Sequence, residues 1–208
     1  MLVQYVDVVV PLHLHEVERG WLWAVAMTTL EARNFSAEEP SVTVHENFTL
    51  ADNATQYTRK SYDFSDRLPG WISRLVPHRL QAVEEEAWNC FPHCRTVVTH
   101  ASYPEEVFSI EIKTSHLLPE SAGENHPSHV FFLGRAQGGG GVCVRKIIKI
   151  RVHRWGPLGA AIEKFIARKQ VDALHRVYRT MVERRAEWLP LTMAEVRDLE
   201  GRVAVEQN

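Results

Sequence analysis

Hydrophobic and polar residues alternate along much of the chain, and two longer stretches instead repeat at helical spacing. Strict alternation predicts strands, because successive side chains of a strand point to opposite faces of a sheet. Broad apolar stripes at a spacing near 3.6 residues predict long helices at 13–33 and 158–188, and a short helical turn is expected within 68–77. The predicted strands are 2–11, 42–50, 56–64, 82–90, 95–100, 108–117, 130–133 and 142–155.

A last helix is expected to begin after Leu191. Thr192 and Glu195 fit a capping box, in which hydroxyl and carboxylate each accept a backbone N–H at the start of a helix. The order of strand, helix, many strands and long helix is typical of an α+β fold, with a curved antiparallel sheet wrapped around the C-terminal helix. We therefore expect one domain over 1–208, with a glycine-rich break at 138–141.

Composition supports a globular protein. The chain has 208 residues, of which 45% are hydrophobic and 24% charged, enough to bury a core without disulfides. No apolar run approaches the roughly 18 residues that cross a bilayer. The N-terminal strand lacks the basic region of a signal peptide and is interrupted by Asp7. These features predict a cytoplasmic protein.

Charge is unevenly distributed. Residues 142–190 hold twelve Lys or Arg against four Asp or Glu, a balance of +8, so that the rest carries −10. A basic surface of this kind suits anionic lipid headgroups or nucleic acid, or it simply balances acidic surfaces elsewhere. Nucleic acid is the weakest of these, because the basic helix has no interleaved aromatic residues on which bases could stack.

The sequence holds no recognisable catalytic or metal motif. His13 and His15 have no third ligand at a diagnostic spacing, and the glycine run lacks the Lys-Ser/Thr of a phosphate loop. Cys90 and Cys94 are expected to be small buried residues beside a turn. We therefore expect no metal, no cofactor and no enzymatic activity.

Several polar residues lie on predicted strands. Thr58 and Lys60 share a face, and Asn89, Thr96 and Thr114 also occupy strands. If their faces line a cavity, they could hold a polar group while apolar neighbours hold hydrocarbon chains. Periodicity alone favours the other interpretation, a solvated outer face.

Four segments carry a more specific signal. They are EEAWNCFPHCRTVVT at 85–99, QYTRK at 56–60, the helix start at 155–170 and LTMAEVRDLE at 191–200. In this order they closely resemble segments of phosphatidylinositol transfer proteins, and the run CRTVVT resembles the soluble single-domain class of that family.

The resemblance implies a START-like helix-grip fold around a lipid cavity. It implies a cytoplasmic monomer, transiently on membrane surfaces, that exchanges phosphatidylinositol for phosphatidylcholine and carries one phospholipid as cargo. An alternative is a protein that presents phosphatidylinositol to a kinase with little free transfer. A further alternative is a shortened member that has kept the fold and lost transfer.

The resemblance also implies site residues, by matched position. The phosphatidylinositol headgroup would contact Thr58, Lys60, Asn89, Lys146 and Glu200; the phosphatidylcholine headgroup would contact Cys94, Thr96 and Thr114; Arg154 and Trp155 would dock to the membrane. These roles are physically reasonable. Lysine supplies charge to a phosphate, and Glu200 accepts from ring hydroxyls that choline lacks.

The chain departs from the family at several positions. Arg154 and Trp155 replace a pair of tryptophans, so docking should depend more on anionic lipid. Trp21 stands where the family has a glutamine that contacts choline lipid. Several dozen residues, including a regulatory loop, are missing between Leu133 and Cys143. With helix 191–205 as the remaining lid, we expect weaker retention of lipid and faster exchange.

Overall fold

The computed structural model of the protein describes residues 1–35, 40–52, 55–65, 68–74, 81–124, 127–134, 141–153 and 156–205. Period-two segments form strands and 3.6-period segments form helices, as the sequence predicts. The strands are β1 (Leu2–Val10), β2 (Ser41–Thr49), β3 (Gln56–Asp63), β4 (Ala82–Cys90), β5 (His93–Thr99), β6 (Phe108–Leu117), β7 (His129–Phe132) and β8 (Val142–Val152). The helices are α1 (Leu14–Phe35), α2 (Gly70–Ser73), the 3-10 helix η2 (Pro119–Ser121), α3 (Pro157–Glu183), α4 (Arg185–Trp188) and α5 (Met193–Val205).

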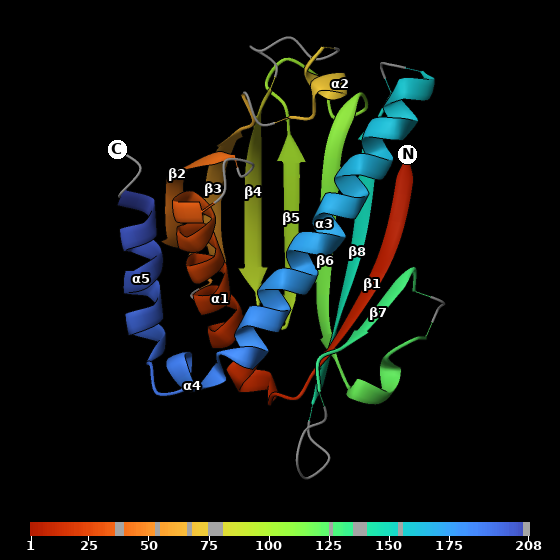
Figure 1. Cartoon of the computed structure of the whole chain (residues 1–208). Coiled ribbons are helices and arrows are strands. Elements are labelled where there is room, and N and C mark those ends of the chain that lie inside the picture. Colours follow the sequence, from red (N-terminus) through yellow and green to blue (C-terminus); the bar gives the residue numbers. More distant parts are fainter. Residues whose placement is uncertain are drawn as a thin grey trace. The chain divides into compact units, whose positions relative to one another are not determined.

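The eight strands belong to one sheet in the order β2-β3-β4-β5-β6-β8-β1-β7 (Figure 1). Consecutive strands from β2 to β5 pair in antiparallel fashion, and the predicted α+β fold is confirmed. The edge pair β1–β7 is parallel, so the sheet is mixed rather than purely antiparallel. Alternation of side chains identifies a strand but carries no information about the direction of its partner.

The chain packs as two compact units. Unit 1 comprises residues 1–4, 36–113 and 147–168, and unit 2 comprises 5–35, 114–146 and 169–208. The boundaries fall inside β1, β6, β8 and α3. The single domain expected from the sequence stays a prediction. No helix in the described part of the chain has the length and apolar character needed to cross a membrane.

A close helix contact organises the core of unit 2. Gly20 on α1 lies against Trp188, which is fully buried and donates its indole N–H to the carbonyl of Met181 at 2.8 Å. A β-carbon at Gly20 would lie only 2.7 Å from the indole ring. The absence of a side chain at this position therefore allows α1 to approach the tryptophan.

The long C-terminal helix is interrupted, contrary to the prediction of one helix from 158 to 188. It ends at Glu183, and Arg184 has a non-helical backbone with φ −104° and ψ 27°. In a continuous helix the Met181 carbonyl would accept the N–H of Arg185, but here it accepts the Trp188 indole instead. A side chain that enters the helical hydrogen-bond ladder is a recognised cause of such breaks.

Two helix starts are fixed by side chains. The predicted capping box is confirmed: Glu195 accepts the backbone N–H of Thr192 at 2.7 Å, and the Thr192 hydroxyl accepts the N–H of Glu195 at 3.2 Å. At the start of α1, buried Glu16 accepts the N–H of His13 at 2.8 Å and pairs with Arg185 at 2.6 Å. Burial acts to raise the pKa of Glu16, but these partners outweigh it and hold the pKa below its ordinary value.

Candidate functional site

Five of the predicted headgroup residues share one face of the sheet in unit 1, which we call the inner face. Its first two cross-strand rows are Gln56–Asn89–Cys94 and Thr58–Ala87–Thr96, and the third is Lys60–Glu85–Val98. Directly paired residues lie on the same side of a sheet, with β-carbons roughly 5 Å apart. Strands β3, β4 and β5 therefore bring Thr58, Lys60, Asn89, Cys94 and Thr96 together.

The inner face is not a solvated surface at its centre. Thr58 is 8% exposed, and its neighbours Ala87 and Val98 are each 6% exposed. Lys60 and Asn89 are half-buried. The interpretation of this strand face as an outer, solvated one is therefore wrong for Thr58, because strand periodicity cannot tell which face of a sheet is covered.

Two further polar residues on the inner face escaped the sequence analysis. Glu85 lies directly across from Lys60 in the register, and Tyr62 donates its hydroxyl to Glu85 at 3.2 Å. Burial, with a smaller contribution from the Glu85 carboxylate, raises the pKa of Tyr62 well above its ordinary value. The signal was available, since Tyr62 follows Lys60 by two residues and so shares its face.

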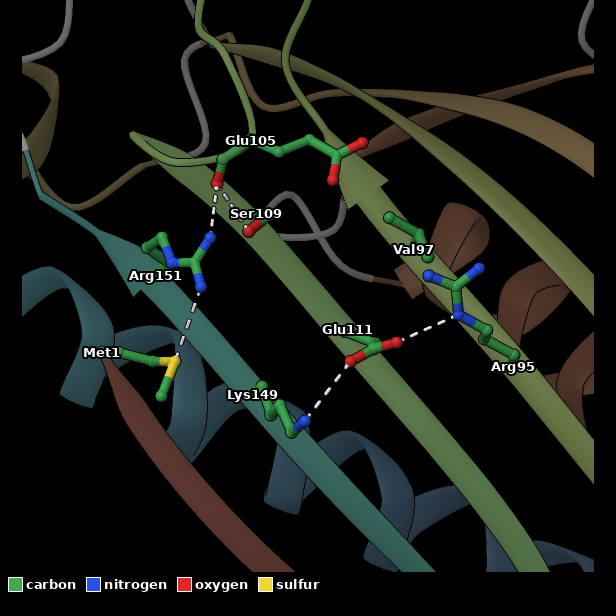
Figure 2. Close-up of a pocket in the computed structure, with 8 residues that line it drawn as sticks. All are labelled: Met1, Arg95, Val97, Glu105, Ser109, Glu111, Lys149 and Arg151. Carbon is green, nitrogen blue, oxygen red and sulfur yellow. Dashed lines mark hydrogen bonds and ion pairs between the residues drawn. The ribbon is translucent and has the colours of Figure 1, made fainter.

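The opposite face of the same strands, the outer face, is occupied by ion pairs. Figure 2 shows a hollow of about 220 Å³ there, with Glu111 between Arg95 and Lys149. The Glu111 carboxylate lies 3.0 Å from Arg95, 3.8 Å from Lys113 and 3.7 Å from Lys149. Burial acts to raise the pKa of Glu111, but the cations outweigh it and lower the pKa. No predicted headgroup residue lines this hollow.

Unit 2 contains a buried lysine. Lys146 on β8 is 6% exposed and donates to the hydroxyl of Thr114 at 2.9 Å, itself 7% exposed. The ammonium lies over the ring of Trp21, 4.6 Å from its centroid, and 6.0 Å from the centroid of Tyr178. The resemblance assigned Lys146 and Thr114 to different headgroups, and the structure joins them directly.

The remaining predicted residues lie elsewhere. Glu200 on α5 is half-buried and accepts a hydrogen bond from Arg197 at 2.8 Å. Near it, α5 and α1 border a groove of about 620 Å³ that includes Trp23, Met27 and Leu199 (Figure 1). Arg154 and Trp155, and the glycine run at 138–140, lie outside the described residues.

The cysteine expectation was wrong. Cys90 is exposed and Cys94 is half-buried, whereas Cys143 is the buried one. The sequence does place Cys90 and Cys94 on either side of a turn, but the turn lies at the surface. Within the described residues, the structure contains no cluster of three or more His, Cys, Asp or Glu side chains suited to a metal ion.

Comparison with known proteins adds independent support. The family model "Phosphatidylinositol transfer protein" matches residues 1–131 and 136–205. Phosphatidylinositol transfer protein 1 of Dictyostelium discoideum is 35% identical over 125 residues, covering 60% of this chain and 47% of that protein. The mouse phosphatidylinositol transfer protein beta isoform is 24% identical over 255 residues, covering 99% of this chain and 93% of the relative.

Membrane-associated phosphatidylinositol transfer protein 1 of Homo sapiens is 26% identical, covering 98% of this chain and 20% of that protein. The chain thus spans less than half the length of the Dictyostelium relative and a fifth of this human one. Among solved structures, Ara h 8.0201 has a TM-score of 0.46 and 9% identity, covering 88% of this chain and 98% of that one.

The alignment also bears on the predicted shortening. The match to the beta isoform runs over 255 residues although this chain has 208, so the chain is shorter than its relative. The family match is interrupted at 132–135, beside the segment in which the sequence indicates missing residues. Relatives of both the single-name and the membrane-associated type align at similar identity, 24% and 26%. With the family model matched over nearly its whole length, the chain belongs to the phosphatidylinositol transfer protein family, whose relatives here are named as transfer proteins rather than enzymes.

Proposed function

We propose that the chain binds one phospholipid molecule, phosphatidylinositol or phosphatidylcholine, in its interior and exchanges it between membranes. The family match over 1–131 and 136–205 carries this proposal. The polar inner face of unit 1 supports it, because a row of hydroxyl, ammonium and amide groups on a half-buried sheet face suits a polar headgroup.

The inner face offers each interaction that an inositol phosphate needs. Lys60 supplies a positive charge for the phosphate, and the Asn89 amide can both donate to and accept from ring hydroxyls. Thr58 adds a buried hydroxyl between them, since successive residues on one strand face lie roughly 7 Å apart. In unit 2, Lys146 and Glu200 are the further inositol contacts in this proposal.

Two apolar acyl chains would provide most of the binding free energy. Each methylene removed from water contributes about 0.8 kcal/mol, and a diacyl lipid has dozens of them. The polar residues then select the headgroup, because buried groups left unpaired by the wrong ligand cost free energy. Cys94 and Thr96 are the unit 1 residues that we propose for a choline headgroup.

The proposed docking surface and lid carry over from the sequence. Arg154 and Trp155 would meet a membrane containing anionic lipid, and helix 191–205 would cover the bound molecule. Loss of the loop after Leu133 predicts faster exchange than in the longer relatives. The active form is proposed to be a monomer in the cytoplasm.

The test is transfer of labelled phosphatidylinositol between donor and acceptor vesicles. Lys60→Ala should reduce phosphatidylinositol transfer at least tenfold. Arg59→Ala is the matched control, because Arg59 is the preceding residue on the outer face and pairs with Glu46 at 3.1 Å. The control should transfer like the wild type.

Absence of transfer by the wild-type protein above the blank would refute the exchange function. If the protein bound phosphatidylinositol without transferring it, presentation of the lipid to a kinase would replace exchange as its function. Equal loss of transfer in Lys60→Ala and Arg59→Ala would refute the headgroup assignment of the inner face.

A further inference from the structure

The ammonium of Lys146 rests on a pair of aromatic rings in unit 2. The centroids of Trp21 and Tyr178 lie 4.6 Å apart, and the ammonium lies 4.6 Å from the first and 6.0 Å from the second. The hydrogen bond to Thr114 holds it in place at 2.9 Å. Tyr178 is 1% exposed, so this arrangement is buried.

Such an aromatic pair is suited to a cation. The faces of tryptophan and tyrosine carry negative potential, and proteins that recognise quaternary ammonium groups use aromatic faces to do so. Trp21 stands at the position where the resemblance places a glutamine, so the ring that completes the pair distinguishes this chain from its relatives. Lys146 already occupies the position over these rings that a choline group would need.

We propose that Lys146, seated on Trp21 and Tyr178, determines headgroup specificity by excluding choline lipids. A trimethylammonium group that entered this site would meet a charge of its own sign, where burial weakens dielectric screening. It would also find the hydroxyl of Thr114 engaged by the lysine. An inositol phosphate carries no cation and is attracted by the same charge.

This inference rests on the proposed function and narrows it from either lipid to the inositol lipid. It also makes an unusual prediction about Trp21. With Lys146 removed, the aromatic pair becomes free to hold a choline group, so the same tryptophan that supports exclusion in the wild type should promote choline binding in the variant.

The experiment exposes the purified protein to vesicles of equal phosphatidylinositol and phosphatidylcholine content, and counts the captured lipids by mass spectrometry. The wild type should capture mostly phosphatidylinositol. Lys146→Met should raise the ratio of phosphatidylcholine to phosphatidylinositol at least tenfold. Adding Trp21→Leu to Lys146→Met should reverse most of that increase, because the ring that held the choline group is gone.

Two controls separate specificity from loss of charge and loss of folding. Lys149→Met removes a lysine from the same strand, but its side chain lies on the outer face beside Glu111, so the lipid ratio should stay unchanged. Lys146→Arg keeps the positive charge and should keep the preference for phosphatidylinositol. If Lys146→Met does not fold, Lys146→Gln takes its place in the same measurement.

Capture of both lipids in equal amounts by the wild type would overturn the inference. So would an unchanged ratio in the folded Lys146 variant, or the same change in Lys149→Met. These results leave phospholipid binding itself standing. Capture of neither lipid by the wild type would overturn the proposed function together with this inference.

Discussion

A buried ion pair in unit 2 yields the sharpest stability prediction. Asp7 on β1 is completely buried, and its carboxylate accepts hydrogen bonds from Arg145 at 2.8 and 2.9 Å and from the Gly123 N–H at 3.0 Å. The same guanidinium donates to the carbonyls of Ser121 and Glu124, at 2.7 and 3.2 Å. This network ties β1 and β8 to the segment that follows η2.

Replacing Asp7 by alanine leaves Arg145 without its anionic partner while its side chain stays only 13% exposed. Removing one member of a buried pair typically costs about 3–5 kcal/mol, because a poorly solvated charge is left behind. Arg145 would keep its two carbonyl partners, which favours the lower end, about 3 kcal/mol. At roughly 2–4 °C per kcal/mol for a chain of this size, the melting temperature should fall by about 6–12 °C.

Urea denaturation followed by tryptophan fluorescence measures this loss. Glu111→Ala is the matched control, since it removes an acid from an ion-pair cluster whose cations are about half exposed. Such surface pairs contribute about 1 kcal/mol or less. The reasoning is refuted if Asp7→Ala loses less than about 1 kcal/mol, or no more than Glu111→Ala does.

Two further predictions concern helix α1. Gly20→Ala should destabilise the protein by about 1–3 kcal/mol, because the new β-carbon would lie within 3 Å of buried Trp188. Gly201→Ala, in an open position on α5, should be neutral or stabilising by up to about 1 kcal/mol; a stable Gly20→Ala protein in urea denaturation would contradict the packing argument. The carboxylate of Glu16 has a lowered pKa in the folded state, so its contribution to stability is present above the unfolded value of 4.5 and is lost as the pH falls below it. The stability difference between wild type and Glu16→Gln, measured by denaturation from pH 6 to pH 3, should therefore shrink on acidification, and a difference independent of pH would refute this role.

Local patterns in the sequence predicted much of the fold. The bounds of β4 and β6 agree with the predicted strands, because alternation of side chains is a property of neighbouring residues. The capping box at Thr192 depends on two side chains three residues apart, and it formed as expected. The shared face of Thr58 and Lys60 follows from the same short-range rule.

Contacts between distant residues could not be predicted in this way. Asp7 and Arg145 are separated by 138 positions, and nothing near Asp7 in the sequence indicates its partner. The contact of Lys146 with Thr114 likewise requires two strands to be placed side by side. The break after Glu183 depends on where the indole of Trp188 points, which helical periodicity does not encode.

Native mass spectrometry after incubation with phosphatidylinositol vesicles tests the central proposal most directly. The protein should gain the mass of one phosphatidylinositol molecule, and Lys60→Ala should lose most of this complex while Arg59→Ala keeps it. Bare protein in every spectrum, with no adduct of lipid mass after exposure to the vesicles, would contradict the proposal that this chain carries a phospholipid.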